Sequence, residues 1–297
     1  MSERAEQPAG NIYDLGYQPY DGPRLGRRHA VYSLYIYSLR NIFGLGRSML
    51  SKAFPLGLAL IAAVPALIQL AIAAIVPLEF DFIRPEDYFE FIQIILALFC
   101  AVVAPEIVGR DQRNRTLPLY FSRALSRADY VSAKWGALTV ALVLVLAIPQ
   151  IILILGNAVA TSDLLDYLSG NLDMVLPILA SSVIVALMMG SVSLAIASQT
   201  SKRAFATGAV LAYFVIFTAL GAILVETTTG DVQRYLIFIS PVNVLDGCVR
   251  WIFDAPSVFD SDLAQVDLPG VSYFIAALAY TGVSLAVLYR RFLRLAV

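Results

Sequence analysis

The chain has 297 residues and a net charge of −1; 59% of its residues are hydrophobic, 14% are charged, and its mean hydropathy is +0.75. Soluble domains have about 45–50% apolar and about 25% charged residues, and disordered chains are poor in hydrophobic residues, so both classes are excluded. The near-zero charge gives no reason to expect nucleic acid as a partner, and one histidine with two cysteines provides no spacing for a metal site.

The first 52 residues contain no segment apolar enough to cross a membrane. Residues 1–27 are polar and contain three prolines, which predicts a cytoplasmic tail without a signal peptide. Residues 28–52 alternate apolar residues and tyrosines with arginines, which predicts a helix at the membrane interface, broken near Gly44 and Gly46. The alternative is a simple basic anchor beside the first span.

Six later segments have the length, about 20 mostly apolar residues, that crosses roughly 30 Å of hydrocarbon. These segments are 53–78, 88–108, 135–155, 174–197, 204–225 and 271–289. Their apolar residues are continuous or follow helical periodicity, unlike the short alternating strands of an outer-membrane barrel. The sequence therefore predicts an all-α integral membrane protein, with one six-helix transmembrane domain over residues 53–297.

Lysine and arginine are distributed unevenly between the segments that flank the spans. Eighteen of the 21 lie before span one, between spans two and three, between spans four and five, or after span six. The remaining connections hold only Arg84, Arg234 and Arg250. Because basic residues are enriched on the cytoplasmic side, both termini are predicted to be cytoplasmic.

A further apolar stretch, residues 235–253, precedes the last span. It contains Ser240, Pro241 and Arg250, and if it crossed the membrane the basic C-terminal tail would face outward. We interpret it as a bent outer segment that enters the membrane partway, where its backbone must be buried in protein or line a wet cavity. An amphipathic helix lying on the outer leaflet is the equally weighted alternative.

The connection between spans two and three, residues 109–134, contains the strongest local signals. Thr116 is expected to cap a short helix that tolerates Pro118 in its first turn. Ser126 and Asp129 have capping-box spacing and are expected to begin a second helix that runs through Lys134 into span three. The apolar residues of the short helix are Leu117, Leu119, Tyr120 and Phe121. Such a helix, flanked by arginines, needs a partner, which is either the anionic inner leaflet or a soluble subunit.

Charged residues surround this short helix at the cytoplasmic rim. Glu106 and Arg110 are four residues apart, so an ion pair along one helix face is expected. The alternative is that Glu106 ties span two to the 109–134 loop or to a partner subunit. The residues expected to link the rim to the loop are Glu106, Arg110, Asp111, Arg127 and Asp129.

These residues resemble the coupling segment of type-2 ATP-binding-cassette (ABC) exporters. The resemblance is carried by Arg115-Thr-Leu-Pro-Leu119, then Leu125-Ser-Arg127 and Lys134, and more loosely by Ser240-Pro241 in the outer segment. The chain is similar to the transmembrane permease subunit of that family, which implies a coupling helix at residues 116–122. The implied docking residues for an ABC ATPase are Arg115, Thr116, Leu117, Pro118, Leu119, Tyr120, Phe121 and Arg123. Ala124 departs from the pattern, since relatives often have proline there.

The resemblance further implies a bacterial plasma (inner) membrane protein that pairs with a second copy of itself, as a homodimer, or with a related permease, surrounded by membrane lipid. Lys52, Lys134 and Lys202 never follow glycine, so the chain lacks a P-loop. ATP and Mg²⁺ are therefore expected on a separate ATPase subunit, and no catalytic activity or cofactor is expected here.

The expected function is export of a substrate, driven by an ATPase that docks on the 109–134 loop. The alternative is a secondary transporter or channel independent of ATP. That class should contain an inverted repeat and an ion site in the middle of the membrane, and the sequence contains no sign of either.

Overall fold

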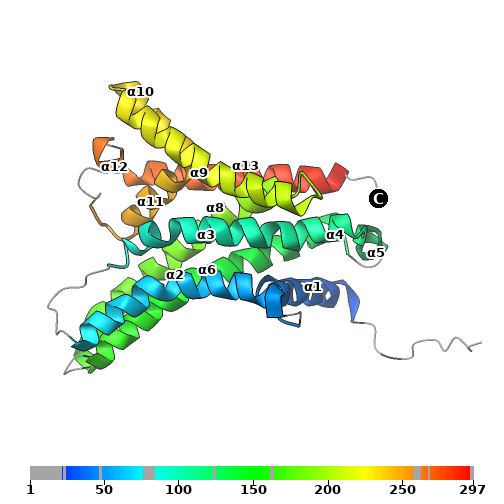
Figure 1. Cartoon of the computed structure of the whole chain (residues 1–297), viewed down its shortest axis with the longest axis horizontal. Coiled ribbons are helices and arrows are strands. Elements are labelled where there is room, and N and C mark those ends of the chain that lie inside the picture. Colours follow the sequence, from blue (N-terminus) through cyan, green and yellow to red (C-terminus); the bar gives the residue numbers. More distant parts are fainter. Residues whose placement is uncertain are drawn as a thin grey trace, which may run out of the picture.

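Long helices dominate the structure, a computed structural model that describes residues 22, 25–46, 49–75, 84–122, 125–160, 164–256, 262–266 and 268–294. Within these ranges every regular element is a helix and no strand is present, so the predicted all-α class is confirmed. Figure 1 shows the long helices running lengthwise, side by side.

Six helices in the described part of the chain are long and apolar enough to cross a membrane, as the sequence predicts. They are centred on α2 (Met49–Ile75), α3 (Tyr88–Ala104), α6 (Arg127–Ala160), α8 (Val175–Ala197), α9 (Arg203–Thr227) and α13 (Gly270–Arg294). The span of α3 continues through the next turns to Arg113, and the span of α8 begins at Ser169. A seventh crossing would exist only if a bent helix pair before α13 counted as one span.

The helix α6 begins at Arg127, as the capping-box spacing of Ser126 and Asp129 predicts, and continues into the apolar segment predicted as span three from residue 135. Its 34 residues extend about 50 Å, whereas the hydrocarbon core is about 30 Å thick. The first turns of α6 are therefore available to the 109–134 loop. Hydropathy marks only the apolar part of such a helix, so the predicted span starts later than the helix that contains it.

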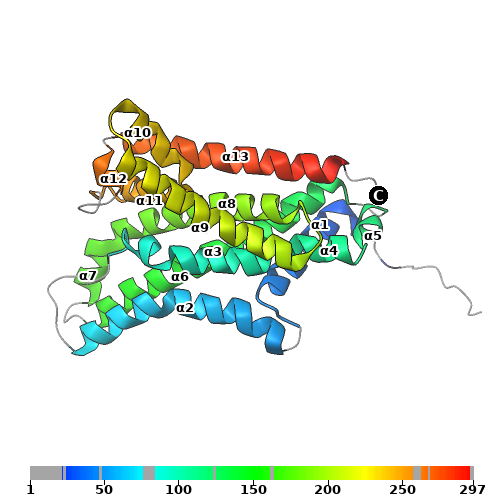
Figure 2. The ribbon, with the colours of Figure 1, turned by 45° about the horizontal axis from the view of Figure 1, so that its top comes forward.

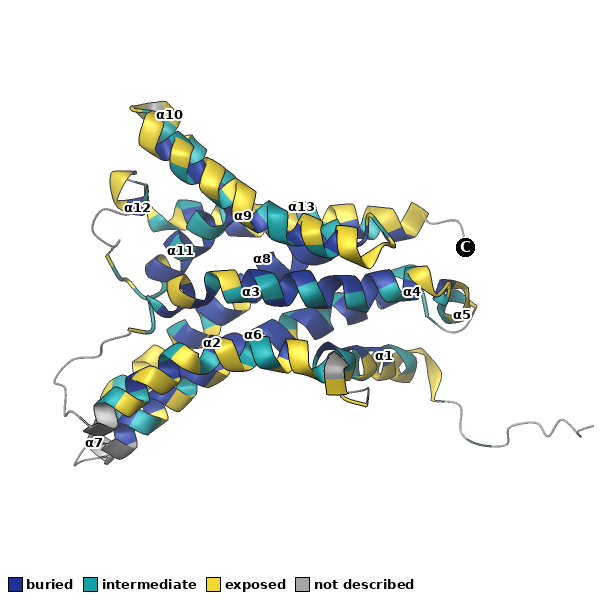
Figure 3. Ribbon diagram, in the orientation of Figure 1, coloured by how far each residue is buried: buried dark blue, intermediate teal, exposed yellow. Residues whose placement is uncertain are grey.

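The helices α3, α6 and α8 form the core. More than half of the apolar part of each is buried, against 22% for α2, α9 and α13. In Figure 3, α9 and α13 carry more exposed surface than α3. The helix α8 lies close to α6 at Gly190, where an added Cβ would contact Leu142 at 3.6 Å. Small residues of this kind allow helices to approach closely.

The N-terminal segment divides into two helices at the glycines that the sequence singles out. The helix α1 (Gly26–Ile42) ends in a turn where Gly44 and Gly46 have φ of 67° and 86°, a conformation that glycine adopts without strain. Residues 49–52 then belong to α2, so the predicted interfacial helix is shorter than 28–52. The helix α1 packs along α6, and most of the predicted tail, residues 1–27, lies outside the described residues.

The outer segment is bent, as predicted from Ser240 and Pro241. Its elements are α10 (Asp231–Leu236), a 3-10 turn (Ile237–Ile239) and α11 (Pro241–Ile252). The two arms of this segment meet at 102°. Ser240 Oγ caps α11 by accepting the Asn243 N–H at 3.1 Å, and Pro241 occupies the first turn, where its missing N–H is tolerated. How far this segment enters a membrane stays a prediction.

The two ends of the bundle contain different short helices. In Figures 1 and 2, α1, α4, α5 and the C-terminal end of the chain lie at one end, which we call the loop end. The helices α7, α10 and α12 lie at the opposite end. The newly named short helices are α4 (Arg110–Arg113), α5 (Leu117–Phe121), α7 (Leu164–Asn171) and α12 (Asp262–Gln265). Segments predicted to be cytoplasmic thus gather at one end, while their orientation in a membrane stays a prediction.

The outer segment touches α9 at Gly221, which gives a first test of the fold. A Cβ at Gly221 would lie 2.6 Å from Ser240 Cβ and 3.1 Å from the Ser240 nitrogen, so Gly221→Ala must displace the bend. We expect a loss of about 1–3 kcal/mol in the free energy of unfolding, measured in detergent micelles. The control Gly208→Ala, also on α9, meets nothing within 4 Å and should not lose stability. Equal stability of the two variants would contradict this packing.

Candidate functional site

The 109–134 loop begins with a change of helix type at the end of α3. Pro105 has no N–H to donate, and Pro105–Gly109 form a π-helical turn that continues directly into α4. Arg115 then adopts a left-handed conformation, with φ of 51°, and reverses the chain before α5. A left-handed non-glycine residue costs about 1–2 kcal/mol, so contacts elsewhere in the loop must stabilise this turn.

The short helix α5 has one face against the bundle. Leu117 is buried, and the rings of Tyr120 and Phe121 lie 5.6 Å and 5.8 Å from the ring of Tyr130 on α6. Leu119, by contrast, is 67% exposed. Aromatic contacts of this kind fix the orientation of α5, because each ring packs against the same partner.

This orientation corrects two expectations. The apolar residues of the short helix do not all face a partner: Leu117, Tyr120 and Phe121 pack inward, so the exposed face is smaller than the sequence suggests. Thr116 does not cap α5, because its backbone is helical and its Oγ1 donates to the Asp111 carbonyl at 3.3 Å instead. The exposed side of the loop carries Arg113, Asn114, Arg115, Pro118, Leu119 and Ser122. Arg123 and Ala124 lie outside the described residues.

A buried ion pair joins α4 to α6. Lys134 Nζ lies 2.9 Å from Asp111 Oδ2, and the Tyr130 O–H donates to the same oxygen at 2.7 Å. Both charged residues are buried, and the Lys134 ammonium also lies 5.4 Å from the centre of the Tyr130 ring. Buried charges are tolerated only when paired and hydrogen-bonded, so this cluster holds α4 and α6 in one arrangement. The sequence places Asp111 at the rim but does not identify Lys134 as its partner.

Glu106 connects the end of α3 to two arginines. Arg110 Nη1 lies 3.7 Å from Glu106 Oε1, which confirms the expected pair four residues apart. Arg203 Nη1, at the start of α9, lies 3.8 Å from Glu106 Oε2. Gln112 Nε2 also donates to the Ser198 carbonyl at 3.3 Å. The loop is thereby linked to the connection between α8 and α9, which sequence spacing could not reveal.

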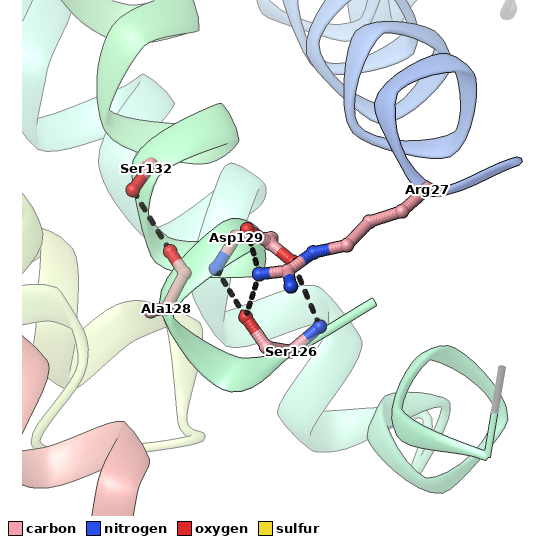
Figure 4. A network of polar contacts seen from close by, with 5 residues as sticks. All are labelled: Arg27, Ser126, Ala128, Asp129 and Ser132. Carbon is pink, nitrogen blue, oxygen red and sulfur yellow. Dashed lines mark hydrogen bonds and ion pairs between the residues drawn. The ribbon is translucent and has the colours of Figure 1, made fainter. Parts of the chain in front are cut away.

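The start of α6 is fixed by a reciprocal capping box, as predicted. Ser126 N–H donates to Asp129 Oδ2 at 3.0 Å, and Asp129 N–H donates to Ser126 Oγ at 3.1 Å. Figure 4 shows Arg27 reaching this box from α1. Arg27 Nε and Nη2 donate to the two Asp129 carboxylate oxygens at 2.7 Å and 2.9 Å. This bidentate pair adds a contact between the first helix and the end of the loop.

Arg127 connects the loop to the last helix. Its Nη1 donates to the Leu293 carbonyl on α13 at 2.6 Å. Its guanidinium also lies 5.7 Å from the centre of the Phe121 ring. The Tyr130 ring, in turn, lies 5.3 Å from the ring of Phe292. The loop is thus in contact with α1, α3, α6 and α13.

A second charged cluster lies around the outer segment. Arg250 on α11 is buried and contacts Asp87 at 3.1 Å, Glu90 at 3.2 Å and Asp246 at 3.3 Å. The cluster attaches α11 to the start of α3. Ser240 and Pro241 thus form the bend of the outer segment, and Arg250 fixes α11, which follows the bend. Asp246 lies four residues before Arg250 on α11, but no local pattern in the sequence joins this pair to Asp87 and Glu90.

A family model described as ABC-2 family transporter protein matches residues 34–296. The chain belongs to the ABC-2 family of transporter proteins. The match extends from within α1 to the end of α13 and includes all six candidate spans and the 109–134 loop. This ABC-2 chain is therefore a membrane permease subunit, and the family implies an ATPase partner. A comparison with curated proteins gives no match.

The buried ion pair of this ABC-2 permease yields a second test. Lys134→Met removes the cation beside the buried Asp111 carboxylate, and we expect the free energy of unfolding to fall by about 3–5 kcal/mol. The double variant Asp111→Asn/Lys134→Met contains no unpaired buried charge and should recover part of that loss. Both are measured by unfolding in detergent micelles. Lys202→Met, an exposed control at the loop end, should change stability by less than about 0.5 kcal/mol.

The ion-pair interpretation would be wrong if Lys134→Met were as stable as the parent. It would also be wrong if the double variant were less stable than Lys134→Met alone, because the two residues would then contribute independently.

Proposed function

We propose that this permease exports a substrate across the bacterial plasma membrane, with both termini cytoplasmic and an ABC ATPase docked on the 109–134 loop. The observation that carries the proposal is the exposed Leu119 face of α5 on a helix whose other face is fixed to the bundle. The family match, the gathering of basic segments at the loop end and the lack of a P-loop support it. In this assembly the permease would bind the substrate, and the ATPase would bind ATP and Mg²⁺.

The exposed side of α5 suits a groove in a soluble subunit. Pro118 and Leu119 supply apolar surface, and Arg113 and Arg115 stand exposed beside them. A short rigid helix with a central apolar residue and a basic rim resembles the anchors that dominate other protein interfaces. The proposed groove in the ATPase is therefore apolar at its base and acidic at its edge.

The contacts of the loop support a route for mechanical coupling. The helix α4 continues from α3 without a break, Asp111 is paired with Lys134 on α6, and Arg127 is bonded to α13. Movement of α5 by an ATPase would therefore act on three spans together. Rigid packed elements of this type transmit small displacements between distant sites.

The outward faces of the bundle support a second permease copy, as a homodimer, or a related permease, with lipid around the pair. The helices α2, α9 and α13 are 22% buried over their apolar parts, and α9 exposes Phe205, Val215, Ile216 and Ile223. In the proposed assembly part of this surface contacts the partner permease and the rest contacts lipid. The family match favours this ATP-driven assembly over a secondary transporter or channel.

Co-purification with an ABC ATPase tests the proposal. The permease is co-expressed with each ABC ATPase of its source organism in turn, and complex formation and ATP hydrolysis in lipid are measured. Leu119→Asp places a charge at the centre of the proposed interface, so we expect a loss of about 2 kcal/mol or more in binding, roughly 30-fold in affinity. The control Leu25→Asp changes a residue with similar exposure, 63% against 67%, outside the loop.

We expect Leu25→Asp to form the complex normally and Leu119→Asp to lose it. An ATPase that binds Leu119→Asp as well as the parent would overturn α5 as the docking site. Failure of every ATPase to co-purify with the parent would overturn ATP-driven transport by this chain.

A further inference from the structure

A cavity of about 470 Å³ lies at the loop end, between α1, α2 and the junction of α3 with α4. Its apolar wall includes Ile42, Phe54 and Val103. Its polar wall includes Asn41, Arg110 and Arg203. A cavity of this volume is within the usual range for a small-molecule ligand. Because the lining combines apolar and charged side chains, it suits a ligand that is itself amphipathic.

The charged side of this cavity has an excess of positive charge. Arg110 and Arg203 share Glu106, whereas Lys134 and Asp111 neutralise each other. The two Glu106 contacts are long, at 3.7 Å and 3.8 Å, and the arginine side chains are 38% and 55% exposed. Two accessible guanidinium groups beside one carboxylate favour an anion, and guanidinium groups bind phosphate oxygens well.

Neutral donors complete the charged side. Tyr120 lines the cavity, and burial, with a smaller contribution from Asp111, raises the pKa of its hydroxyl to about 12. This hydroxyl therefore keeps its proton at physiological pH and can donate a hydrogen bond. Asn41 adds an amide from the last turn of α1. The charged side of the cavity thus offers both cations and neutral donors to an anionic group.

The apolar side opens toward the outer surface of α2. Phe54 lines the cavity and is also 66% exposed, so one residue belongs to both surfaces. Phe54 lies in the second turn of α2, an apolar helix that is mostly unburied. In a membrane this surface would contact acyl chains. A ligand could therefore enter from the bilayer, with its polar end held inside.

We propose that this cavity binds an anionic phospholipid of the adjacent leaflet, with its phosphate between Arg110 and Arg203 and its acyl chains leaving past Phe54. The proposal rests on the membrane placement in the proposed function but not on ATPase docking. The bound headgroup would contact the helix that leads into α5. Lipid composition would then influence the arrangement of the 109–134 loop.

Native mass spectrometry of the purified full-length permease in detergent tests this proposal. The probes are phosphatidylglycerol, phosphatidylcholine with the same acyl chains, and glycerol 3-phosphate. We expect phosphatidylglycerol to bind at least tenfold more tightly than phosphatidylcholine, and Arg203→Gln and Arg110→Gln each to weaken it by about fivefold. Arg113→Gln and Lys202→Gln remove the same charge from neighbouring residues outside the cavity lining and should bind like the parent.

Glu106→Gln distinguishes a charge effect from a loss of folding. Removing this carboxylate increases the positive charge of the cavity, so phosphatidylglycerol should bind more tightly, whereas a damaged structure would bind it less tightly. Weaker binding by Glu106→Gln, or equal losses in Arg203→Gln and Lys202→Gln, would overturn the proposal. Binding of glycerol 3-phosphate as strong as that of phosphatidylglycerol would assign the cavity to a soluble phosphate instead. ATPase co-purification is measured separately, so failure here leaves the docking proposal standing.

Discussion

The loop end depends on the buried pair of Lys134 and Asp111, completed by the hydroxyl of Tyr130. An unpaired charge at either position would carry a large desolvation cost, so the two helices that hold them can be displaced only together. The same Tyr130 ring receives Tyr120 and Phe121 from α5. Tyr130 thus takes part both in the buried ion-pair cluster and in the ring packing that orients the exposed face of α5.

A buried cation paired with carboxylates is present at both ends of the bundle. At the loop end a buried lysine is paired with a carboxylate, and at the opposite end a buried arginine, Arg250, is shared by three carboxylates. Each cluster attaches a short or bent helix to a long one. The middle of the bundle, by contrast, is packed through apolar and small residues such as those around Gly190. Buried ion pairs therefore hold the short and bent helices against the long ones, and close apolar packing holds the spans against each other.

Features that depend on neighbouring residues could be predicted from the sequence. The six spans, the capping box of Ser126 and Asp129, the pair of Glu106 with Arg110 and the bend at Pro241 all follow from spacing or composition over a few turns. The inward orientation of Tyr120 could not be predicted, because it depends on a ring from another helix. The pairing of Lys134 with Asp111 was missed for the same reason, because the two residues lie on different helices. Arg250 has one partner four residues away on its own helix, but its contacts with Asp87 and Glu90 join segments that no local pattern connects.

In the proposed complex, α5 presents Leu119 to an ATPase while Tyr130 holds its other face. Photo-crosslinking from single positions tests this most directly, with p-benzoylphenylalanine introduced at position 119 or 121 of the permease and the ATPase co-expressed. We predict crosslinks to the ATPase from position 119 and crosslinks only within the permease from position 121. ATPase crosslinks from position 121 but not from 119, or from neither position, would contradict the claim.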